Sequence, residues 1–266
     1  MVAKYKIQDL TVTLGEELPC AWPTLMPFKK NNSNWYERVE DSSGIVKDNR
    51  GGPFFSEWLV IDEHTGTHFD APSHFIPPPG SGLLNAGPAG KVYGEDVSLS
   101  TMIGPALVLD VTELAGQGEL GCSPFITKKI IMDWEAKNGP IAPCKIVLLY
   151  SGWDKYYGPG EAGNKYSHDP FTKEGPGWPV PDAEAVIYLH EQGVKCLGTD
   201  GVSIGAVQEG LSSHVAGLSR GMVYIECLTN LDKLPTRGFH FVFLPIKLEK
   251  SSGGPGRAVA FIPEDK

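Results

Sequence analysis

Short apolar runs separated by turn-forming residues dominate the chain. The runs at residues 104–111, 145–152 and 194–201 are rich in β-branched residues and contain Gly or Asp at their ends, which is typical of buried sheet strands. Residues 54–62 alternate apolar and polar positions, so this segment predicts a half-buried strand that leads into His64. Further strand-like runs lie at residues 6–14, 222–228, 239–248 and 257–262.

Helical signals lie between these runs. Residues 123–138 begin with Ser123 in the N-cap position and Pro124 in the first helical position, and residues 181–193 end in a C-capping glycine. Both helices precede a strand, but the C-terminal part of the chain mixes strand and loop. The pattern therefore predicts a single α/β domain over residues 1–266 with a mixed β-sheet, and a long Pro/Gly loop at residues 77–90.

Composition narrows the range of partners and compartments. The formal net charge is −9, and no run of Lys or Arg exceeds two residues, which argues against binding to nucleic acid or to a membrane surface and favours a small-molecule partner. The five cysteines are widely spaced and form no C-x-x-C pair, so a disulfide framework is not expected. Neither a signal-peptide pattern nor an apolar run of membrane-spanning length is present, and we predict a cytoplasmic protein.

The segment from His64 to His74 carries the candidate chemistry. It holds three histidines and one aspartate within eleven residues, whereas the whole chain has seven histidines. A single loop histidine more often serves only as a hydrogen-bonded polar residue, but a cluster this dense predicts a metal site. Imidazoles and a carboxylate suit zinc, manganese or ferrous iron, and His64, His68 and Asp70 could supply the three ligands of an open catalytic site. The glycine and proline of the segment favour a turn followed by extended chain, in which His68, Asp70 and His74 point the same way.

The pattern H-x-G-T-H-x-D-x-P-x-H resembles the signature of the cyclase-type metal-dependent hydrolases, the family of bacterial kynurenine formamidases and isatin hydrolases. The likeness extends from about residue 6 to residue 262. In the same order as in the family, further blocks are found at residues 104–111, 147–158, 193–205 and 253–262. The resemblance implies a swivelling β/α/β fold and a homodimer or homotetramer.

The resemblance also implies a larger ligand set. The family places a His and a Glu twelve residues apart after its third block, and His214 and Glu226 match that spacing. By this likeness His64, His68 and Asp70 would hold one ion, and Asp70 with His214 and Glu226 would complete a second. Other members of the family use a single manganese, so the expected cofactor is manganese or zinc, as one ion or two.

His74 takes the position of the family's general acid/base. Trp22, Phe54 and Phe55 lie on segments that lead to the metal motif; each alone more often packs in a core, but together they suggest a pocket for a planar aromatic substrate. Two departures leave the substrate open: Ile204-Gly205 replaces the family's D-P after the serine of its third block, and the segment 154–180 is longer than in compact formamidases.

We therefore predict a metal-dependent hydrolase that cleaves an amide C–N bond of a small aromatic molecule with metal-activated water. The substrate would be either a cyclic amide, isatin-like, or an N-formylkynurenine-like formamide. One alternative is a non-haem iron oxygenase that uses a His/His/Asp triad. Such a triad does not need His214 and Glu226 as further ligands. The other is a non-catalytic protein that binds metal without turnover.

Overall fold

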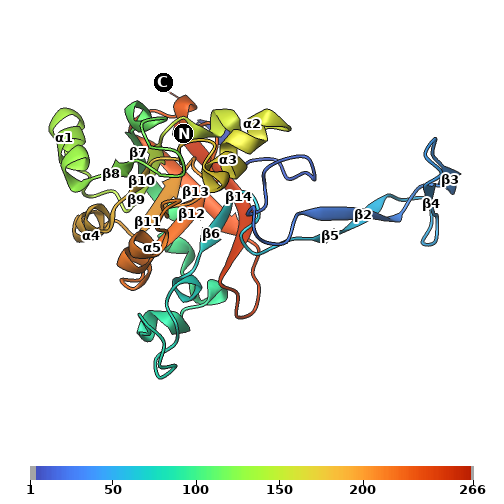
Figure 1. Cartoon of the computed structure of the whole chain (residues 1–266), viewed down its shortest axis with the longest axis horizontal. Coiled ribbons are helices and arrows are strands. Elements are labelled where there is room, and N and C mark those ends of the chain that lie inside the picture. The colour runs from blue at the N-terminus through green and yellow to red at the C-terminus, as the bar shows by residue number, and fades with distance from the viewer. Residues whose placement is uncertain (1–3, 265–266) are drawn as a thin grey trace.

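A closed, mixed β-sheet organises residues 4–264, the part of the chain that the computed structural model describes (Figure 1). Eight strands of this part pair in the order β1-β14-β13-β7-β9-β11-β12-β6, and β6 pairs in addition with β14, which closes the sheet. The sheet confirms the predicted α/β class with a mixed sheet. Its strands are β1 (Tyr5–Asp9), β6 (His68–Asp70), β7 (Ile103–Asp110), β9 (Ile146–Tyr150), β11 (Cys196–Thr199), β12 (Val223–Glu226), β13 (Phe239–Pro245) and β14 (Gly253–Pro263).

The centre of the sheet is parallel and buried on both faces. Strands β7, β9, β11 and β12 run parallel to one another, and this is why their sequences are nearly continuous apolar runs. Alternate residues serve the two faces: Leu107 and Leu109 pack beneath the helices, whereas Ala106 and Val108 face the inside of the closed sheet with Phe241. The helices on the outer face are α1 (Lys128–Asn138), α4 (Ala183–Glu191) and α5 (Leu211–Leu218).

Of the two predicted helices, one is confirmed and one begins later than predicted. Helix α4 fits the helix predicted within residues 181–193. The N-cap of α1 is Thr127, whereas the predicted cap, Ser123, accepts a hydrogen bond from the backbone N–H of Val207. The residues between them form β8 (Phe125–Ile126), which pairs in parallel with β10 (Val180–Pro181). The prediction of Ser123 as the cap was wrong because its hydroxyl accepts a hydrogen bond from Val207, a residue distant in the sequence that the local pattern cannot reveal.

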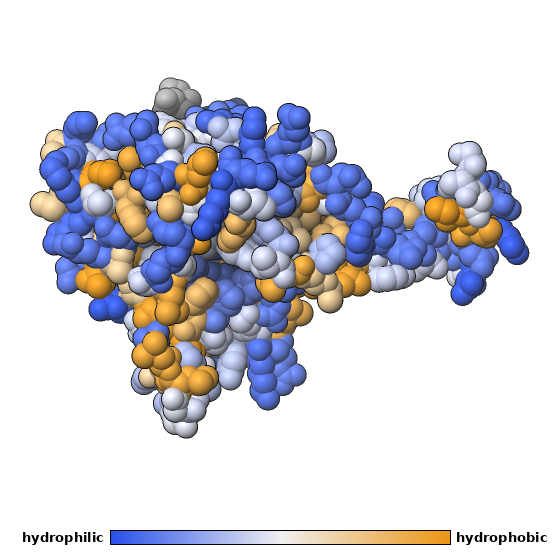
Figure 2. Space-filling view, in the orientation of Figure 1, coloured by the Kyte–Doolittle hydropathy of each residue, from blue (hydrophilic) through white to orange (hydrophobic). Residues whose placement is uncertain are grey.

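A two-stranded ribbon, here called the arm, projects from the body (Figures 1 and 2). It consists of β2 (Lys29–Asn34) and β5 (Ser56–Val60), with β3 (Val39–Glu40) and β4 (Val46–Lys47) at its tip. Strand β5 confirms the strand predicted at residues 54–62, but it is not half-buried as predicted. Because β2 is its partner rather than the main sheet, Trp58 stays 50% exposed.

The long segment at residues 154–180 folds into short helical turns that include α2 (Glu161–Gly163) and α3 (Asp169–Thr172). Its start is tied to the end of β11 by the buried carboxylate of Asp200, which accepts hydrogen bonds from Ser151 N (3.0 Å), Ser151 Oγ (2.6 Å) and Trp153 N (3.1 Å). Within the described residues, every helix is too short or too polar to cross a membrane.

Candidate metal centre

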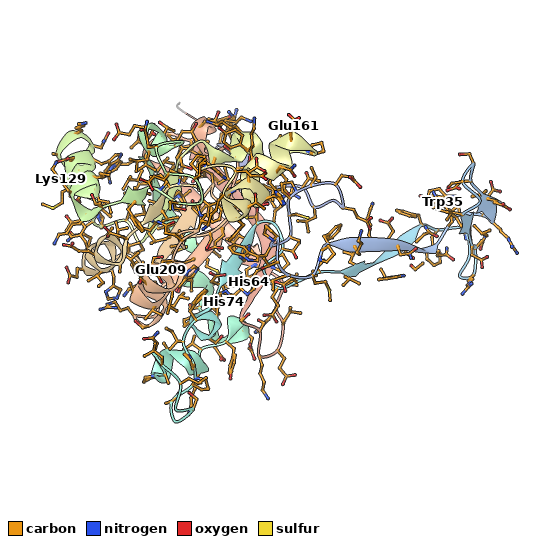
Figure 3. The ribbon with its side chains drawn as sticks, viewed as in Figure 1. Trp35, His64, His74, Lys129, Glu161 and Glu209 are labelled. Carbon is orange, nitrogen blue, oxygen red and sulfur yellow. The ribbon has the colours of Figure 1, made fainter. Side chains whose placement is uncertain are left out.

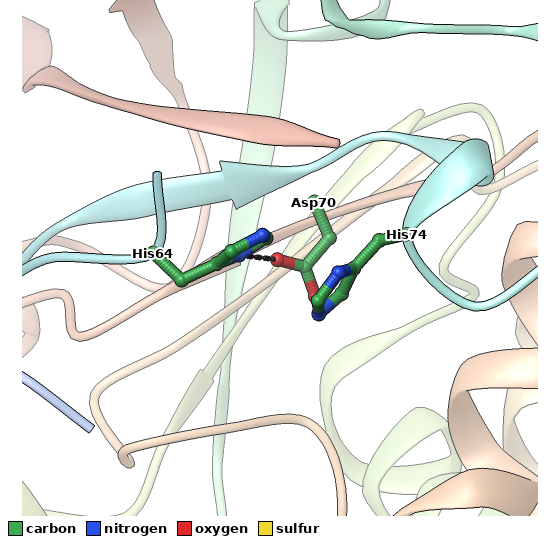
Figure 4. Close-up of side chains that lie close together, drawn as sticks. All are labelled: His64, Asp70 and His74. Carbon is green, nitrogen blue, oxygen red and sulfur yellow. Dashed lines mark hydrogen bonds and ion pairs between the residues drawn. The ribbon is translucent and has the colours of Figure 1, made fainter. Parts of the chain in front are cut away.

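Strand β6 and the turns that flank it hold the histidine-rich motif. His68 and Asp70 lie two residues apart on the strand and project to the same face, as predicted. The predicted extended course through His74 was wrong, because Pro72 starts a 3₁₀ turn over Pro72–His74. That turn brings the ring of His74 back onto His64, with ring centroids 3.9 Å apart and planes inclined by 24° (Figure 4).

His214 and Glu226 meet the motif from two other elements. In the antiparallel pairing of β12 with β6, Glu226 lies opposite His68, and His214 projects from α5. His68 Nε2 lies 3.5 Å from Asp70 Oδ1 and 3.4 Å from Glu226 Oε2. His214 Nε2 lies 3.5 Å from Asp70 Oδ2 and 3.5 Å from Glu226 Oε1. The two residues that the family resemblance added to the motif are thus brought into contact with it.

These separations suit ligands of a common cation. Atoms bound at about 2.0–2.2 Å from a metal ion lie roughly 3–3.5 Å from one another when the coordination is tetrahedral or octahedral. His64 Nδ1 lies 2.9 Å from Asp70 Oδ1, close to the lower end of this range. Oδ1 of Asp70 faces His64 and His68, whereas Oδ2 faces His214, so this carboxylate can contribute to two neighbouring positions.

The hydrogen bonds behind the imidazoles indicate which ring atoms face inward. His68 Nδ1 lies 2.8 Å from the carbonyl oxygen of Gly66, and His214 Nδ1 lies 2.5 Å from that of Gly210. A carbonyl only accepts, so Nδ1 carries a hydrogen and Nε2 faces the carboxylates, where it can present a lone pair to a cation. The buried Oδ2 of Asp70 has no hydrogen-bond partner among the described residues. Lone pairs that converge in a buried space require a positive charge between them, and the donor set therefore fits a divalent cation.

The electrostatics of the cluster agree with this reading. Burial opposes a positive charge on His214, but the contacts with Asp70 and Glu226 outweigh burial and raise its pKa to about 10. Burial also lowers the pKa of His68, but the contacts with Asp70 and Glu226 outweigh this effect and raise the pKa well above its usual value. At His74 burial prevails and lowers the pKa to about 4. The two carboxylates thus draw positive charge to the ligand positions, while His74 stays neutral at pH 7.

An apolar cavity of about 320 Å³ opens above the cluster. Its floor includes His64, His68, His74, His214 and Glu226, and its walls include Trp22, Leu25, Phe75, Phe171 and Val207. The ring of Phe75 stacks on His214, with centroids 3.9 Å apart. A volume of this size, with apolar walls and polar groups gathered at one end, is typical of small-molecule sites.

Two of the three aromatic residues predicted to bind substrate lie elsewhere. Trp22 lines the cavity. Phe54 and Phe55 belong to the arm, are 48% and 44% exposed, and are not among the described residues that line the cavity. Phe55 instead packs against Trp35, which Figure 3 shows at the tip of the arm, well away from His64 and His74. Within one chain, these two phenylalanines therefore do not contact a ligand in the cavity.

Several residues that support the site were not among the sequence-based candidates. Ser203 Oγ (3.0 Å) and the backbone N–H of Ile204 (2.7 Å) both donate to Glu226 Oε1. A side chain at Gly205 would bring a Cβ to 2.7 Å from His214 Cε1, so the Ile204-Gly205 pair that departs from the family pattern leaves room for this histidine. The block at residues 193–205 pointed to this loop, but not to its contact with Glu226.

The chain is similar to known proteins over nearly its whole length. Residues 8–206 match a family model described as putative cyclase. An isatin hydrolase of Roseibium aggregatum is 31% identical, over 97% of this chain and 92% of its own. A kynurenine formamidase of Erythrobacter litoralis is 27% identical, over 96% of this chain and 93% of its own. The crystal structure of an isatin hydrolase bound to the product analogue thioisatinate has a TM-score of 0.77 and 26% identity, and covers 98% of this chain and 93% of that one.

The donor set predicts that a divalent cation stabilises the folded chain. Zn²⁺ or Mn²⁺ added to chelator-treated protein at 100 times its dissociation constant should raise the free energy of unfolding by about 2.7 kcal/mol. In His68→Ala this gain should be largely lost, because the substitution removes a ligand. His240→Ala is the matched control, since His240 is exposed on β13 and belongs to none of the candidate metal-binding groups among the described residues. Urea titrations with and without metal measure both effects, and full stabilisation of His68→Ala would contradict the assignment.

Proposed function

This chain belongs to the putative cyclase family, and on that premise we propose that it is a metal-dependent hydrolase that cleaves an amide C–N bond of a small aromatic molecule. Its relatives named above are hydrolases. The observation that carries the proposal is that His64, His68, His214 and Glu226 line one end of an apolar cavity and that the buried carboxylate of Asp70 contacts the three imidazoles. Coordination, acid/base chemistry and substrate binding would thus share one space.

In this proposal, His64, His68, Asp70, His214 and Glu226 would hold one ion or two. Both zinc and manganese accept such nitrogen and oxygen donors. When bound, the cation lowers the pKa of a water molecule from about 15.7 towards about 7 and polarises the substrate carbonyl. Ser203 and Ile204 hold Glu226 in place by the hydrogen bonds they donate to it.

His74 moves the proton in this mechanism. Burial lowers its pKa to about 4, so its ring is neutral at pH 7 and can accept a proton from the attacking water. The protonated ring can then return that proton to the leaving nitrogen. Its stacking on His64 holds the ring beside the ligand cluster, and His74 also lines the cavity where the substrate would lie.

The cavity walls favour a flat aromatic substrate. Trp22 and Phe171 meet edge to face, with centroids 5.1 Å apart, and Phe75 forms part of the lining. Phe171 comes from the long segment at residues 154–180, so this segment contributes directly to the pocket. We propose a cyclic amide of the isatin type as the first substrate to test and an aryl formamide as the second.

We further propose that two copies of the chain associate through the arm. A two-stranded ribbon is at best marginally stable in water by itself, and this one leaves Trp58 and Leu59 about half exposed, at 50% and 55%. A symmetric pair would cover both arms with one self-complementary contact. The partner of the arm is thus a second copy, and the small aromatic amide is the ligand of the cavity.

Hydrolysis should proceed without oxygen. Protein loaded with Zn²⁺ or Mn²⁺ should convert isatin or N-formylkynurenine under anaerobic conditions, because water is the attacking reagent. The reaction is followed by absorbance, and metal-free protein is the control. Turnover that consumes oxygen would indicate the oxygenase alternative, which needs only a two-histidine, one-carboxylate triad. Metal binding without turnover of any aryl amide or lactone would indicate a non-catalytic protein.

His74→Ala should separate catalysis from metal binding. The variant should keep its metal, as the remaining imidazoles and carboxylates are unchanged, but kcat should fall by about 10²- to 10⁴-fold with the loss of the acid/base group. Metal content by elemental analysis and kcat are measured on the same preparation. If His74→Ala lost its metal while His68→Ala kept it, the two roles would have to be exchanged.

Association through the arm can be tested by adding charge to it. The wild-type chain should have a mass in solution that is a multiple of 28.8 kDa, and Trp58→Glu should shift this mass toward that of one chain. Met132→Glu is the matched control, because Met132 is equally exposed at 50% but lies on α1. Light scattering after size exclusion measures the mass. A single-chain mass for the wild type, or an unchanged mass for Trp58→Glu, would contradict the proposal.

A further inference from the structure

A hydrogen-bonded pair of side chains lies directly behind His64. Ser252, in the loop between β13 and β14, donates to Glu63 Oε2 from both its backbone N–H (2.8 Å) and its hydroxyl (2.7 Å). The same hydroxyl oxygen lies 2.9 Å from His64 Nε2. Glu63 and Ser252 are 189 positions apart in the sequence. The chain Glu63–Ser252–His64 thus joins the metal motif to the C-terminal part of the sheet.

The chemistry of the three groups fixes the direction of these hydrogen bonds. A carboxylate only accepts, so the hydroxyl hydrogen of Ser252 points to Glu63. The hydroxyl oxygen must then accept from His64, and Nε2 carries the hydrogen of that ring. His64 Nδ1 consequently presents its lone pair to Asp70 Oδ1 at 2.9 Å. Two atoms that both accept repel at this distance unless a cation lies between them.

The surrounding backbone holds Ser252 close to His64. The carbonyl oxygen of Ser252 accepts a hydrogen bond from the backbone N–H of Ala71 (2.8 Å), and Gly253 pairs with Asp70 between β14 and β6. A Cβ at Gly253 would lie 2.8 Å from His64 Cε1 and 2.2 Å from the carbonyl oxygen of Phe69. The histidine ring therefore lies directly against β14, and a side chain at position 253 would displace it.

His64 differs in this respect from the other two imidazoles of the cluster. His68 and His214 each bond to a backbone carbonyl, whereas His64 bonds to a side-chain hydroxyl. Its own side chain is also more exposed, at 13% compared with 4% for each of the others. Of these three histidines, His64 is the one whose ring is held by another side chain. A substitution of Ser252 can therefore free this ring to turn.

We propose that Glu63 and Ser252 are positioning residues of the metal centre: they fix the tautomer and the orientation of His64, so that Nδ1 faces the cation. Partners of this kind behind a ligand histidine typically contribute 10- to 100-fold to metal affinity, as an order of magnitude. The inference rests on the proposed function only in that the cluster binds a cation, and hydrolysis plays no part in its test.

Metal affinity of the full chain, measured by competition with a chromogenic chelator for Zn²⁺ and Mn²⁺, tests the proposal. Ser252→Ala should bind metal about 10- to 100-fold more weakly. Glu63→Gln should lose less, because its amide oxygen can still accept from Ser252. The double variant should bind no more weakly than Ser252→Ala, since both residues act through one path. Ser251→Ala is the matched control: its hydroxyl donates to the carbonyl of Leu248 and does not contact His64.

Nitrogen-15 NMR of the imidazoles in the zinc-loaded chain shows which ring nitrogen carries the hydrogen. A loss of stability alone would not change this tautomer. The wild type should show the His64 hydrogen on Nε2 and protected from exchange, and Ser252→Ala should lose that protection while its thermal unfolding without metal matches that of Ser251→Ala. A hydrogen on Nδ1, or unchanged affinity in Ser252→Ala, would overturn the proposal. A wild-type chain that binds neither ion would instead overturn the proposed function together with it.

Discussion

The placement of two carboxylates side by side in the protein interior is the constraint on which the site depends. Asp70 and Glu226 are 1% and 4% exposed, and an ionised carboxylate removed from water is costly unless it is paired and hydrogen-bonded. At each carboxyl, burial alone would raise the pKa, and the charge of Asp70 raises that of Glu226 further; the neighbouring histidines reverse the shift and keep both pKa values low. The charged carboxylates therefore depend on the positive charge that the imidazoles, or a cation among them, provide.

Closure of the sheet brings these groups together. Strand β6 has only three residues, yet it pairs with β12 on one side and with β14 on the other. The first pairing sets Glu226 beside His68, and the second sets Ser252 behind His64. Close contacts need small residues at the junctions, and Gly205 and Gly253 provide them. The histidine motif thus acquires its environment from strands that are far away in the sequence.

How far the site could be predicted from the sequence follows from this geometry. The three histidines and the aspartate of the motif lie within eleven residues, and their spacing alone indicated a shared face for His68 and Asp70. His214 and Glu226 were found through a family pattern, because no local signal connects them to β6. The pair Glu63 and Ser252 left no trace in the sequence, since only the pairing of β14 with β6 makes them neighbours. Alternation at residues 54–62 predicted a strand correctly, but alternation cannot reveal that the strand leaves the body as an arm.

The divergence of pKa values within one cluster separates the proposed ligands from the proposed acid/base group. His214 and His74 lie close together, with ring centroids 6.3 Å apart, yet the pKa of the first is raised to about 10 and that of the second is lowered to about 4. The difference arises because Nε2 of His214 faces both carboxylates, whereas His74 is partly buried against the ring of His64. Opposite shifts in neighbouring groups assign different tasks to them. The position that attracts positive charge suits a cation, and the position that repels it suits a base that takes up a proton only for the duration of a reaction.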